Sequence, residues 1–210
     1  TFLQGSGENG LARAYALKGD PSTSLYHLEI SMKTAFRKSS KEIMLDPAFR
    51  KIENSPEWRK FWKSEWYTDL EEKISEVEFY AAAGMISEAA ALLPEIKRNY
   101  PDNNEVTYAV AMVDLASGKI QDALKPLVLL AGSQPSNEKY LRALAKAQMV
   151  ASNPSGAMET YTKLLSMEVP DADLYIRRAE CYRKTGEFVK ATADIEKYLG
   201  FFPEDKYALS

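Results

Sequence analysis

Histidine and cysteine, which serve most often in nucleophilic and metal chemistry, are scarce in this chain. Its 210 residues include a single histidine, His27, and a single cysteine, Cys181. A Ser–His nucleophile needs a base beside it, whereas His27 has only Glu29 nearby and no spaced set of partners. One cysteine cannot form an internal disulfide or a cysteine-based zinc site. We therefore expect no catalytic residue, no cofactor and no metal, and a buried structural thiol at Cys181.

Composition and charge also argue against other classes of function. The DADL sequence at 171–174 is interpreted as a turn followed by a helix N-cap rather than a cation loop, and no Gly-rich phosphate loop is present. The chain is 45% hydrophobic and 27% charged, as in proteins with an ordinary core. A net charge of -3 provides no global field for nucleic acid, and no apolar run approaches the ~18 residues of a membrane span. We expect a non-enzymatic protein with a protein or peptide partner, no nucleic-acid binding and no membrane insertion by this chain.

The stretch from Asp171 to Asp205 has the pattern of two amphipathic helices joined by a tight turn. Its apolar and small residues recur three and four positions apart, which places them on one face of each helix. Gly186 is expected to end the first helix, because glycine adopts the left-handed cap without a Cβ clash. Pro203 is expected to end the second. The two faces consist of Tyr175, Ala179 and Tyr182, and of Phe188, Ala191, Ile195 and Tyr198.

The same pattern recurs toward the N-terminus at a constant step, the one that separates Ala191 from Ala157. Four copies in unbroken register are much stronger evidence for a repeat than one helix–Gly–helix pattern. The small residue of the second helix is Ala89, Ala123, Ala157 and Ala191; the turn position is Gly84, Gly118, Ser152 and Gly186; and the terminal proline is Pro101, Pro135 and Pro203, with Pro170 one position late.

This register resembles the tetratricopeptide repeat (TPR), in which aromatic, small, glycine, alanine and proline residues stand at fixed offsets. The resemblance, which is to bacterial-type members of the family, implies an all-α fold: a right-handed superhelical α-solenoid of stacked helix-turn-helix repeats. The predicted organisation is a divergent N-terminal TPR at 1–36, an aromatic-rich helical insert at 37–67, four repeats at 70–103, 104–137, 138–171 and 172–205, and a tail at 206–210.

Residues 11–20 resemble the first-helix half of a further, divergent repeat. Gly19 is at the expected turn, and Pro21 is in the first turn of the next helix, where its missing N–H costs nothing. The separation between Gly19 and Gly84 is slightly shorter than two whole repeats, so an insert follows this copy. Its apolar faces are expected to be Leu11, Ala12 and Tyr15, and Leu25, Leu28 and Met32.

The insert contains all three tryptophans, Trp58, Trp62 and Trp66, at a spacing of four that places them on one helical face. They form either an aromatic platform for a ligand or a hydrophobic plug that packs the preceding helix against the repeats. We favour the plug, because each aromatic side chain buries about 150–250 Å². The wording LDPAFRKIENSPEWRKFW resembles a closing segment found after repeats in bacterial TPR proteins, and short helices are expected to start at Asp46–Pro47 and at Ser55–Pro56.

Neither glycine nor proline interrupts residues 57–83, so one long helix could join the insert to the first of the four repeats. Thr68 and Glu71 have the spacing of a capping box, which predicts a break near residue 68 instead. We expect the break.

The residues at both ends of the sequence suggest that it belongs to a longer protein. Thr1 in place of methionine predicts that a targeting segment or part of a longer chain preceded it. The compartment therefore stays open between the cytoplasm and export. Tyr207 and Leu209 stand where another first helix would begin. The tail is thus a short capping helix or the start of a further repeat, and because a solenoid end needs a polar outer face, we expect a fragment or an end covered by a partner.

The resemblance also implies where a partner would bind. In TPR proteins the first helices line the concave side, and the second, fifth, ninth and twelfth positions of each repeat point inward. Carried onto this chain, these positions give an apolar group on one first helix and three cations on the next, flanked by acids. The resulting candidate groove for a peptide or partner helix comprises Tyr108, Met112, Leu115, Lys139, Arg142, Lys146, Ile176 and Glu180.

Two interpretations of this surface remain open. It is a binding groove with an apolar anchor beside a contact for carboxylates, or the three cations pair with Glu105 and neighbouring acids as a solvated face. The lysine and asparagine pair of the best-known TPR binding mode is replaced by Arg142 and Lys146, so binding of a chaperone C-terminus is not implied. The main hypothesis is a protein-binding scaffold. The alternative is a structural or targeting segment of a larger protein.

Overall fold

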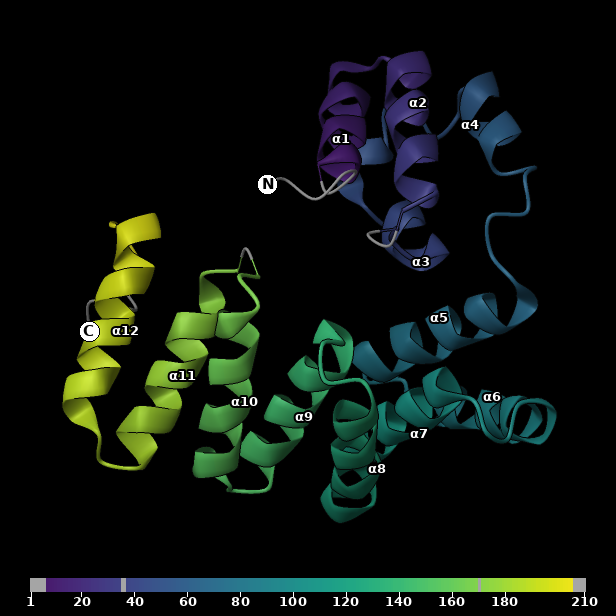
Figure 1. Ribbon diagram of the computed structural model, residues 1–210. Coiled ribbons are helices and arrows are strands. Elements are labelled where there is room, and N and C mark those ends of the chain that lie inside the picture. Colours follow the sequence, from purple (N-terminus) through teal and green to yellow (C-terminus); the bar gives the residue numbers. More distant parts are fainter. Residues whose placement is uncertain (1–6, 35–36, 170, 206–210) are drawn as a thin grey trace. The chain divides into compact units, whose positions relative to one another are not determined.

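The computed structural model describes residues 7–34, 37–169 and 171–205, and all regular structure in this part of the chain is helical (Figure 1). The chain divides into two compact units that meet between Ala83 and Gly84. The two units are described separately below.

The first unit consists of a helical hairpin, short helices of the insert and one longer helix. Its elements are α1 (Glu8–Lys18), α2 (Pro21–Met32), α3 (Ser40–Met44), the 3₁₀ helix η1 (Pro47–Phe49), α4 (Pro56–Phe61) and α5 (Asp69–Ala82).

The hairpin of α1 and α2 turns at Gly19, whose φ of 79° lies in the left-handed region, as predicted. The Asp20 carboxylate then caps α2 by accepting a hydrogen bond from the backbone N–H of Thr23 at 3.1 Å. The inner face predicted for α2 is confirmed, with Leu25, Leu28 and Met32 all buried. The face predicted for α1 is wrong at Leu11, which is 43% exposed, because the small residues Ala12 and Ala16 form the close contact with α2 instead.

The aromatic insert contributes to the core that this hairpin forms. Trp58 and Phe61 are buried, and Trp62, Trp66 and Tyr67 pack against the same cluster. The prediction that the three tryptophans share one helical face is wrong, because α4 ends at Phe61. The chain turns back there, and the Trp66 indole Nε1–H donates to the Phe61 carbonyl at 2.8 Å while its ring stacks on Phe61 at a centroid distance of 4.9 Å. The rings thus pack on one another and on the core of the hairpin, while the Trp62 indole N–H is buried without a hydrogen-bond partner among the described residues. Packing of this plug against the repeats stays a prediction.

The predicted break near residue 68 is confirmed. The Thr68 hydroxyl accepts a hydrogen bond from the N–H of Glu71, and the Glu71 carboxylate accepts one from the N–H of Thr68, which is a complete capping box. The predicted starts at Asp46 and Ser55 are confirmed as well, because each side chain accepts a hydrogen bond from a backbone N–H of the helix that follows it.

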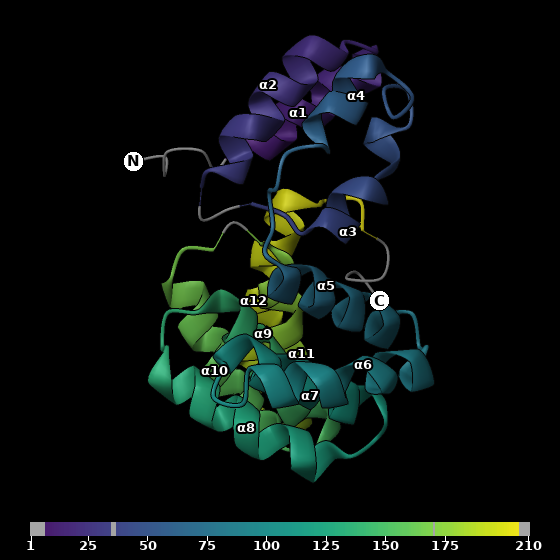
Figure 2. The same cartoon turned by 90° about the vertical axis from the view of Figure 1, so that its right-hand side faces the viewer.

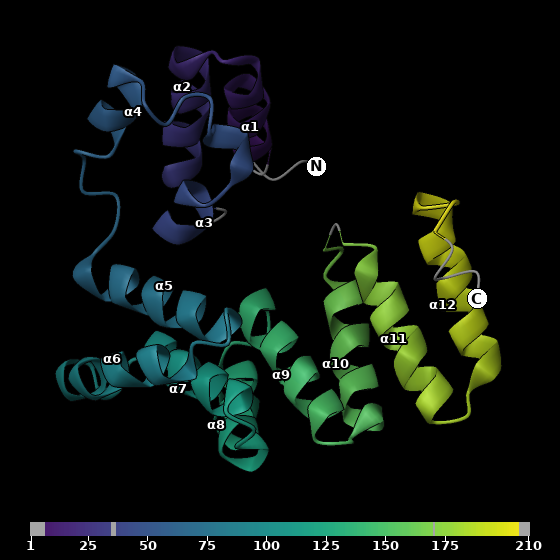
Figure 3. The same cartoon turned by 180° about the vertical axis from the view of Figure 1, so that it is seen from behind.

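The second unit is a row of helices in chain order. Figures 1 and 3 show α8 to α12 side by side, and in Figure 2 the same helices lie one behind another. Hairpins form between α7 and α8, α9 and α10, and α11 and α12, and each hairpin packs on the next through α8 with α9 and α10 with α11. The helices are α6 (Ile86–Asn99), α7 (Asn104–Ala116), α8 (Ile120–Ser133), α9 (Glu138–Val150), α10 (Pro154–Ser166), α11 (Asp173–Lys184) and α12 (Phe188–Phe201).

The turns of these hairpins have the backbone conformation that the repeated glycine predicts. Gly118 and Gly186 have φ of 77° and 80°, and Gly84, at the start of the unit, has 76°. Ser152 takes the same place between α9 and α10 with φ of 57°. A non-glycine residue in this region carries a strain of about 1 kcal/mol or more, so the packing of α9 on α10 must compensate for the missing glycine.

A small, buried residue recurs on the second helix of each hairpin. Ala123, Ala157 and Ala191, each one repeat apart, are 0%, 0% and 6% exposed. Around them Leu127, Leu164 and their neighbours form one continuous core that extends from α7 to α11. The second unit therefore contains three stacked helical hairpins, and the division of residues 70–205 into four repeats stays a prediction.

Some predictions concern parts of the chain that this description does not reach. The unit boundary separates α5 from α6, so their pairing as the repeat 70–103 stays a prediction. Pro170 and the 206–210 tail lie outside the described residues.

The first prediction tests the helix crossing. Replacing Ala157 with leucine inserts a larger side chain into a position that is 0% exposed, and overpacking of this kind lowers the free energy of unfolding by about 1–3 kcal/mol. Chemical denaturation followed by circular dichroism measures the change. The control is Ala193→Leu on the exposed side of α12, which should change the stability by less than about 0.5 kcal/mol. Equal stability of the two variants would show that the register is wrong.

Candidate protein-binding surface

The predicted groove residues lie on the first helices of the three hairpins, α7, α9 and α11. Each of these helices begins at a side chain that accepts a backbone hydrogen bond. The Asn103 side chain accepts from the N–H of Glu105, the Asn137 side chain from the N–H of Tyr140, and the Asp171 carboxylate from the N–H of Asp173. Positions one repeat apart therefore recur at corresponding places on successive first helices.

The apolar part of the predicted groove is mostly inside the protein. Tyr108 and Leu115 are each only 8% exposed and belong to the continuous core, while Met112 is half-buried against it. The expectation of a solvent-exposed apolar face on α7 is therefore wrong for Tyr108 and Leu115. The reason is that α9 packs beside α7, so that Tyr140 covers the Tyr108 ring at a centroid distance of 5.6 Å.

The first cation of the predicted row, Lys139, connects α9 to α7. Its ammonium lies 2.7 Å from the Glu105 carboxylate and 4.3 Å from the centre of the Tyr108 ring. Glu105 also accepts a hydrogen bond from the Tyr140 hydroxyl at 2.5 Å. Four side chains from two repeats thus form one cluster, which fixes the two first helices relative to each other and leaves Lys139 committed to this contact.

The second cation, Arg142, is shared between two carboxylates. Its guanidinium lies 2.7 Å from Glu138 on its own helix and 2.7 Å from Asp171 ahead of α11. Partial burial disfavours the charge, but the hydrogen bonds to Glu138 and Asp171 outweigh this effect and raise the pKa of Arg142. Beside it is a small polar cavity of about 180 Å³, lined by Arg142, Tyr161, Asp171, Asp173, Leu174 and Arg177.

The third cation and the α11 residues remain accessible. Lys146 is exposed and has no ion pair among the described residues. Ile176 and Glu180 on α11 are half-buried, and Glu180 lies 3.7 Å from Lys184. Met112, Lys146 and Glu180 occupy the same position in successive repeats, so this row crosses the first helices of the unit. Within the described part of the chain, this row therefore presents a cation without an ion pair, Lys146, between an apolar and an acidic neighbour, and such a combination suits binding of a polypeptide.

One buried charge pair was not predicted from the sequence. Arg178 donates to both carboxylate oxygens of Asp194 at 2.7 Å, between α11 and α12. Asp194 is 3% exposed, and its hydrogen bonds raise the pKa of Arg178. The signal was an acid shortly after Ala191, on the inner stripe of α12. The pair joins α11 to α12, with the Asp194 carboxylate buried and the Arg178 side chain partly exposed.

The structure supports the chemistry expected for Cys181. The thiol is 0% exposed and lies 3.3 Å from the sulfur of Met149. Burial raises the pKa of Cys181 to about 11, so the reactive thiolate is scarce at neutral pH. Over the described residues, no cluster of three or more His, Cys, Asp or Glu side chains is placed to hold a metal ion. His27 is engaged by Glu8 through its Nδ1 at 2.7 Å and stacks on Tyr15.

Stacked helical hairpins of this kind place the fold in the α-solenoid class, and solved structures of TPR-type proteins share it. PilW, described as a widely conserved type IV pilus biogenesis factor, superposes with a TM-score of 0.59 at 16% identity, over 99% of this chain and 98% of PilW. MamA from Desulfovibrio magneticus RS-1 superposes with a TM-score of 0.56 at 12% identity, over 98% of this chain and 99% of that MamA chain. A further MamA structure superposes with a TM-score of 0.54 at 13% identity, over 93% of this chain and 90% of that MamA chain.

No protein-family model matches the chain, and no curated protein is found as a relative. The likeness to PilW and MamA therefore establishes the fold. Among the described helices, none is long and apolar enough to cross a bilayer.

The cluster around Glu105 generates a stability prediction. Replacing Glu105 with alanine removes the carboxylate that both Lys139 and the buried Tyr140 use, and loss of such a partner costs about 1–3 kcal/mol. The control Glu138→Ala removes one pair within α9 and should cost only about 0.5 kcal/mol. Urea denaturation of both variants measures the difference. If Glu138→Ala is as harmful as Glu105→Ala, the cluster does not join the two helices.

Cys181 generates a prediction about pH. Because the folded pKa of about 11 exceeds that of an unfolded thiol, the stabilising contribution is complete below about pH 8.5 and is lost as the pH rises toward 11. The free energy of unfolding should fall over this range, and more steeply than in a Cys181→Ala variant. At pH 8 the native thiol should react with a disulfide reagent far more slowly than it does in urea. A native thiol that reacts as fast as the unfolded one would contradict its burial.

Proposed function

We propose that this chain is a non-enzymatic scaffold of the TPR family, which binds an extended peptide or a partner helix along the first helices of its second unit. The observation that carries the proposal is the row formed by α7, α9 and α11, whose equivalent positions present Met112, Lys146 and Glu180. The division into four repeats from 70 to 205 and the bacterial type of the family are part of the same proposal. The shared fold with PilW, a biogenesis factor, is in keeping with a role in organising other proteins.

The burial and pairing of the side chains reduce the number of predicted groove residues that are available to a partner. Tyr108, Leu115 and Lys139 hold neighbouring repeats together, so they shape the surface rather than contact a ligand. The residues left to contact a partner are Met112, Arg142, Lys146, Ile176 and Glu180.

The chemistry of these residues defines the partner. Lys146 is suited to a carboxylate, and Arg142 adds a second, already shared, positive charge beside the polar cavity. An exposed ion pair contributes only about 0.2–1 kcal/mol, so an apolar side chain of the partner must also pack on Met112 or Ile176. We infer a polypeptide segment with an acidic residue beside an apolar anchor.

Charge reversal at Lys146 tests the proposal. The chain is immobilised and exposed to a lysate of its source cell, and the captured proteins are quantified by mass spectrometry. Lys146→Glu should reduce the capture of specific partners by about tenfold, the loss expected where a central contact turns repulsive. It should leave the thermal unfolding curve unchanged because the side chain is exposed.

Lys163→Glu is the matched control, because Lys163 is also exposed but lies on a second helix, α10. This variant should capture the same partners as the unmodified chain. The proposal is wrong if the unmodified chain and both variants retain the same set of proteins in the same amounts.

A further inference from the structure

The last helix carries an apolar stripe beside the face that packs on α11. Its residues, spaced by seven, four and three positions, lie on one face of a helix. Phe188 and Phe202 at its ends are 65% and 49% exposed, while Ala191 and Asp194 on the adjoining face are buried against α11. We call this set the α12 stripe: Phe188, Ile195, Leu199 and Phe202.

The two central positions of the stripe, Ile195 and Leu199, are covered in the two preceding hairpins, whereas Phe202 corresponds to the exposed residues Glu168 and Gln134. Stepping back from Ile195 by one repeat and then by another gives Tyr161 on α10 and Leu127 on α8, which are 8% and 0% exposed. Leu199 corresponds to Leu165 and Ala131, and all four of these earlier residues pack in the continuous core. What covers them is the next first helix, since α9 packs on α8 and α11 packs on α10. Ile195 and Leu199 therefore form the same joining surface at the next place in the row, and the exposed rings of Phe188 and Phe202 extend it at both ends.

We propose that the α12 stripe binds an amphipathic helix of a partner protein, which lies on α12 as α11 lies on α10. The chemistry of that helix follows from the helices that occupy the equivalent places. Its buried face presents a large apolar residue in the first turn, as Leu174 does, and a small one two turns later, as Cys181 does; these residues are 1% and 0% exposed. This interaction surface is separate from the groove on the first helices.

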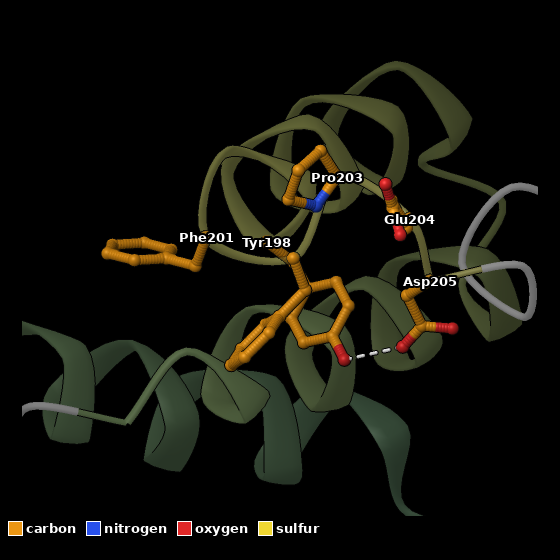
Figure 4. A pocket seen from close by; sticks show the side chains of 6 residues that line it. Tyr198, Phe201, Pro203, Glu204 and Asp205 are labelled. Carbon is orange, nitrogen blue, oxygen red and sulfur yellow. Dashed lines mark hydrogen bonds between the residues drawn. The ribbon is translucent and has the colours of Figure 1, made fainter.

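The charge at one end of the stripe sets the direction of the partner helix. A cavity of about 450 Å³ lies there, lined by Tyr198, Phe201, Phe202, Pro203, Glu204 and Asp205. Figure 4 shows the Tyr198 hydroxyl pointing to Asp205, to which it donates a hydrogen bond of 2.6 Å.

An antiparallel partner helix begins at this end, as α11 begins where α10 ends. Carboxylates stabilise the positive N-terminal end of a helix, and Glu204 and Asp205 provide them. The equivalent joint already shows this arrangement, because Asp171, one repeat before Asp205, accepts a hydrogen bond from the first turn of α11.

The test uses a helix known to fit the equivalent surface. A fluorescent, helix-constrained peptide with the sequence of α11, Asp173–Lys184, is titrated with the whole chain, and fluorescence anisotropy reports binding. We expect saturable binding that the double variant Phe188→Glu, Phe202→Glu weakens by at least about tenfold, since a few apolar anchors dominate such contacts. Both side chains are exposed, so the variant should unfold at the same temperature as the unmodified chain.

Val189→Glu is the matched control, because Val189 is 86% exposed beside Phe188 but lies outside the α12 stripe. It should bind the peptide with unchanged affinity, as should Lys146→Glu, which separates this surface from the proposed groove. A peptide with lysine in place of its Leu174 and Cys181 residues should not bind.

Three results would overturn the inference. One is the absence of binding, and another is binding that the double variant leaves unchanged. The third is concentration-dependent dimerisation in sedimentation that the double variant abolishes while the peptide fails to bind. That result would assign the α12 stripe to a second copy of the chain.

Discussion

The close crossing of two helices at a single alanine is the constraint on which the second unit depends. At Ala123 and Ala157 no part of the side chain reaches solvent, so each methyl group is enclosed by packed neighbours and leaves no room for a larger side chain. This close packing fixes where every larger side chain of the hairpin lies, because protein interiors are packed as densely as organic crystals. Left-handed turns at Gly118 and Gly186 complete the hairpins, and each closed hairpin then offers its outer face to the next.

Stacking the hairpins uses side chains that would otherwise be available to a ligand. Tyr108 and Lys139 look like groove residues in the sequence because they stand at inward positions of their repeats. Between adjacent first helices, however, the Lys139 ammonium finds both a carboxylate and an aromatic face, and a cation–π contact of this kind is worth about 0.5–2 kcal/mol. The recognition surface that we propose is what remains after these contacts are made, namely a narrower row with Lys146 at its centre.

The elements of this fold were readable from the sequence because they depend on local rules that repeat. Glycine at the turns, alanine at the crossings and the capping box at Thr68 each act over a short stretch of chain, and the constant step between copies brings them into register. The errors arose where a distant segment decides. Leu11 is exposed because the smaller residues Ala12 and Ala16 are buried in its place. The tryptophans do not share a face because α4 ends at Phe61. The Arg178–Asp194 pair joins two helices, so the pattern within one helix does not predict it. The burial of Tyr108 was not predicted for the same reason, because the residue that covers its ring, Tyr140, belongs to the next first helix.

The constant step also bears on how such a chain tolerates changes of length during evolution. Each joint between hairpins presents the same kind of apolar stripe to the same kind of first helix, so gain or loss of one whole repeat leaves every joint chemically matched. A single insertion or deletion within a helix turns the side chains that follow it in that helix by about 100° and moves the apolar stripe out of its joint. Lineages carrying this architecture can therefore lengthen or shorten in whole blocks, whereas single insertions are confined to the connecting loops.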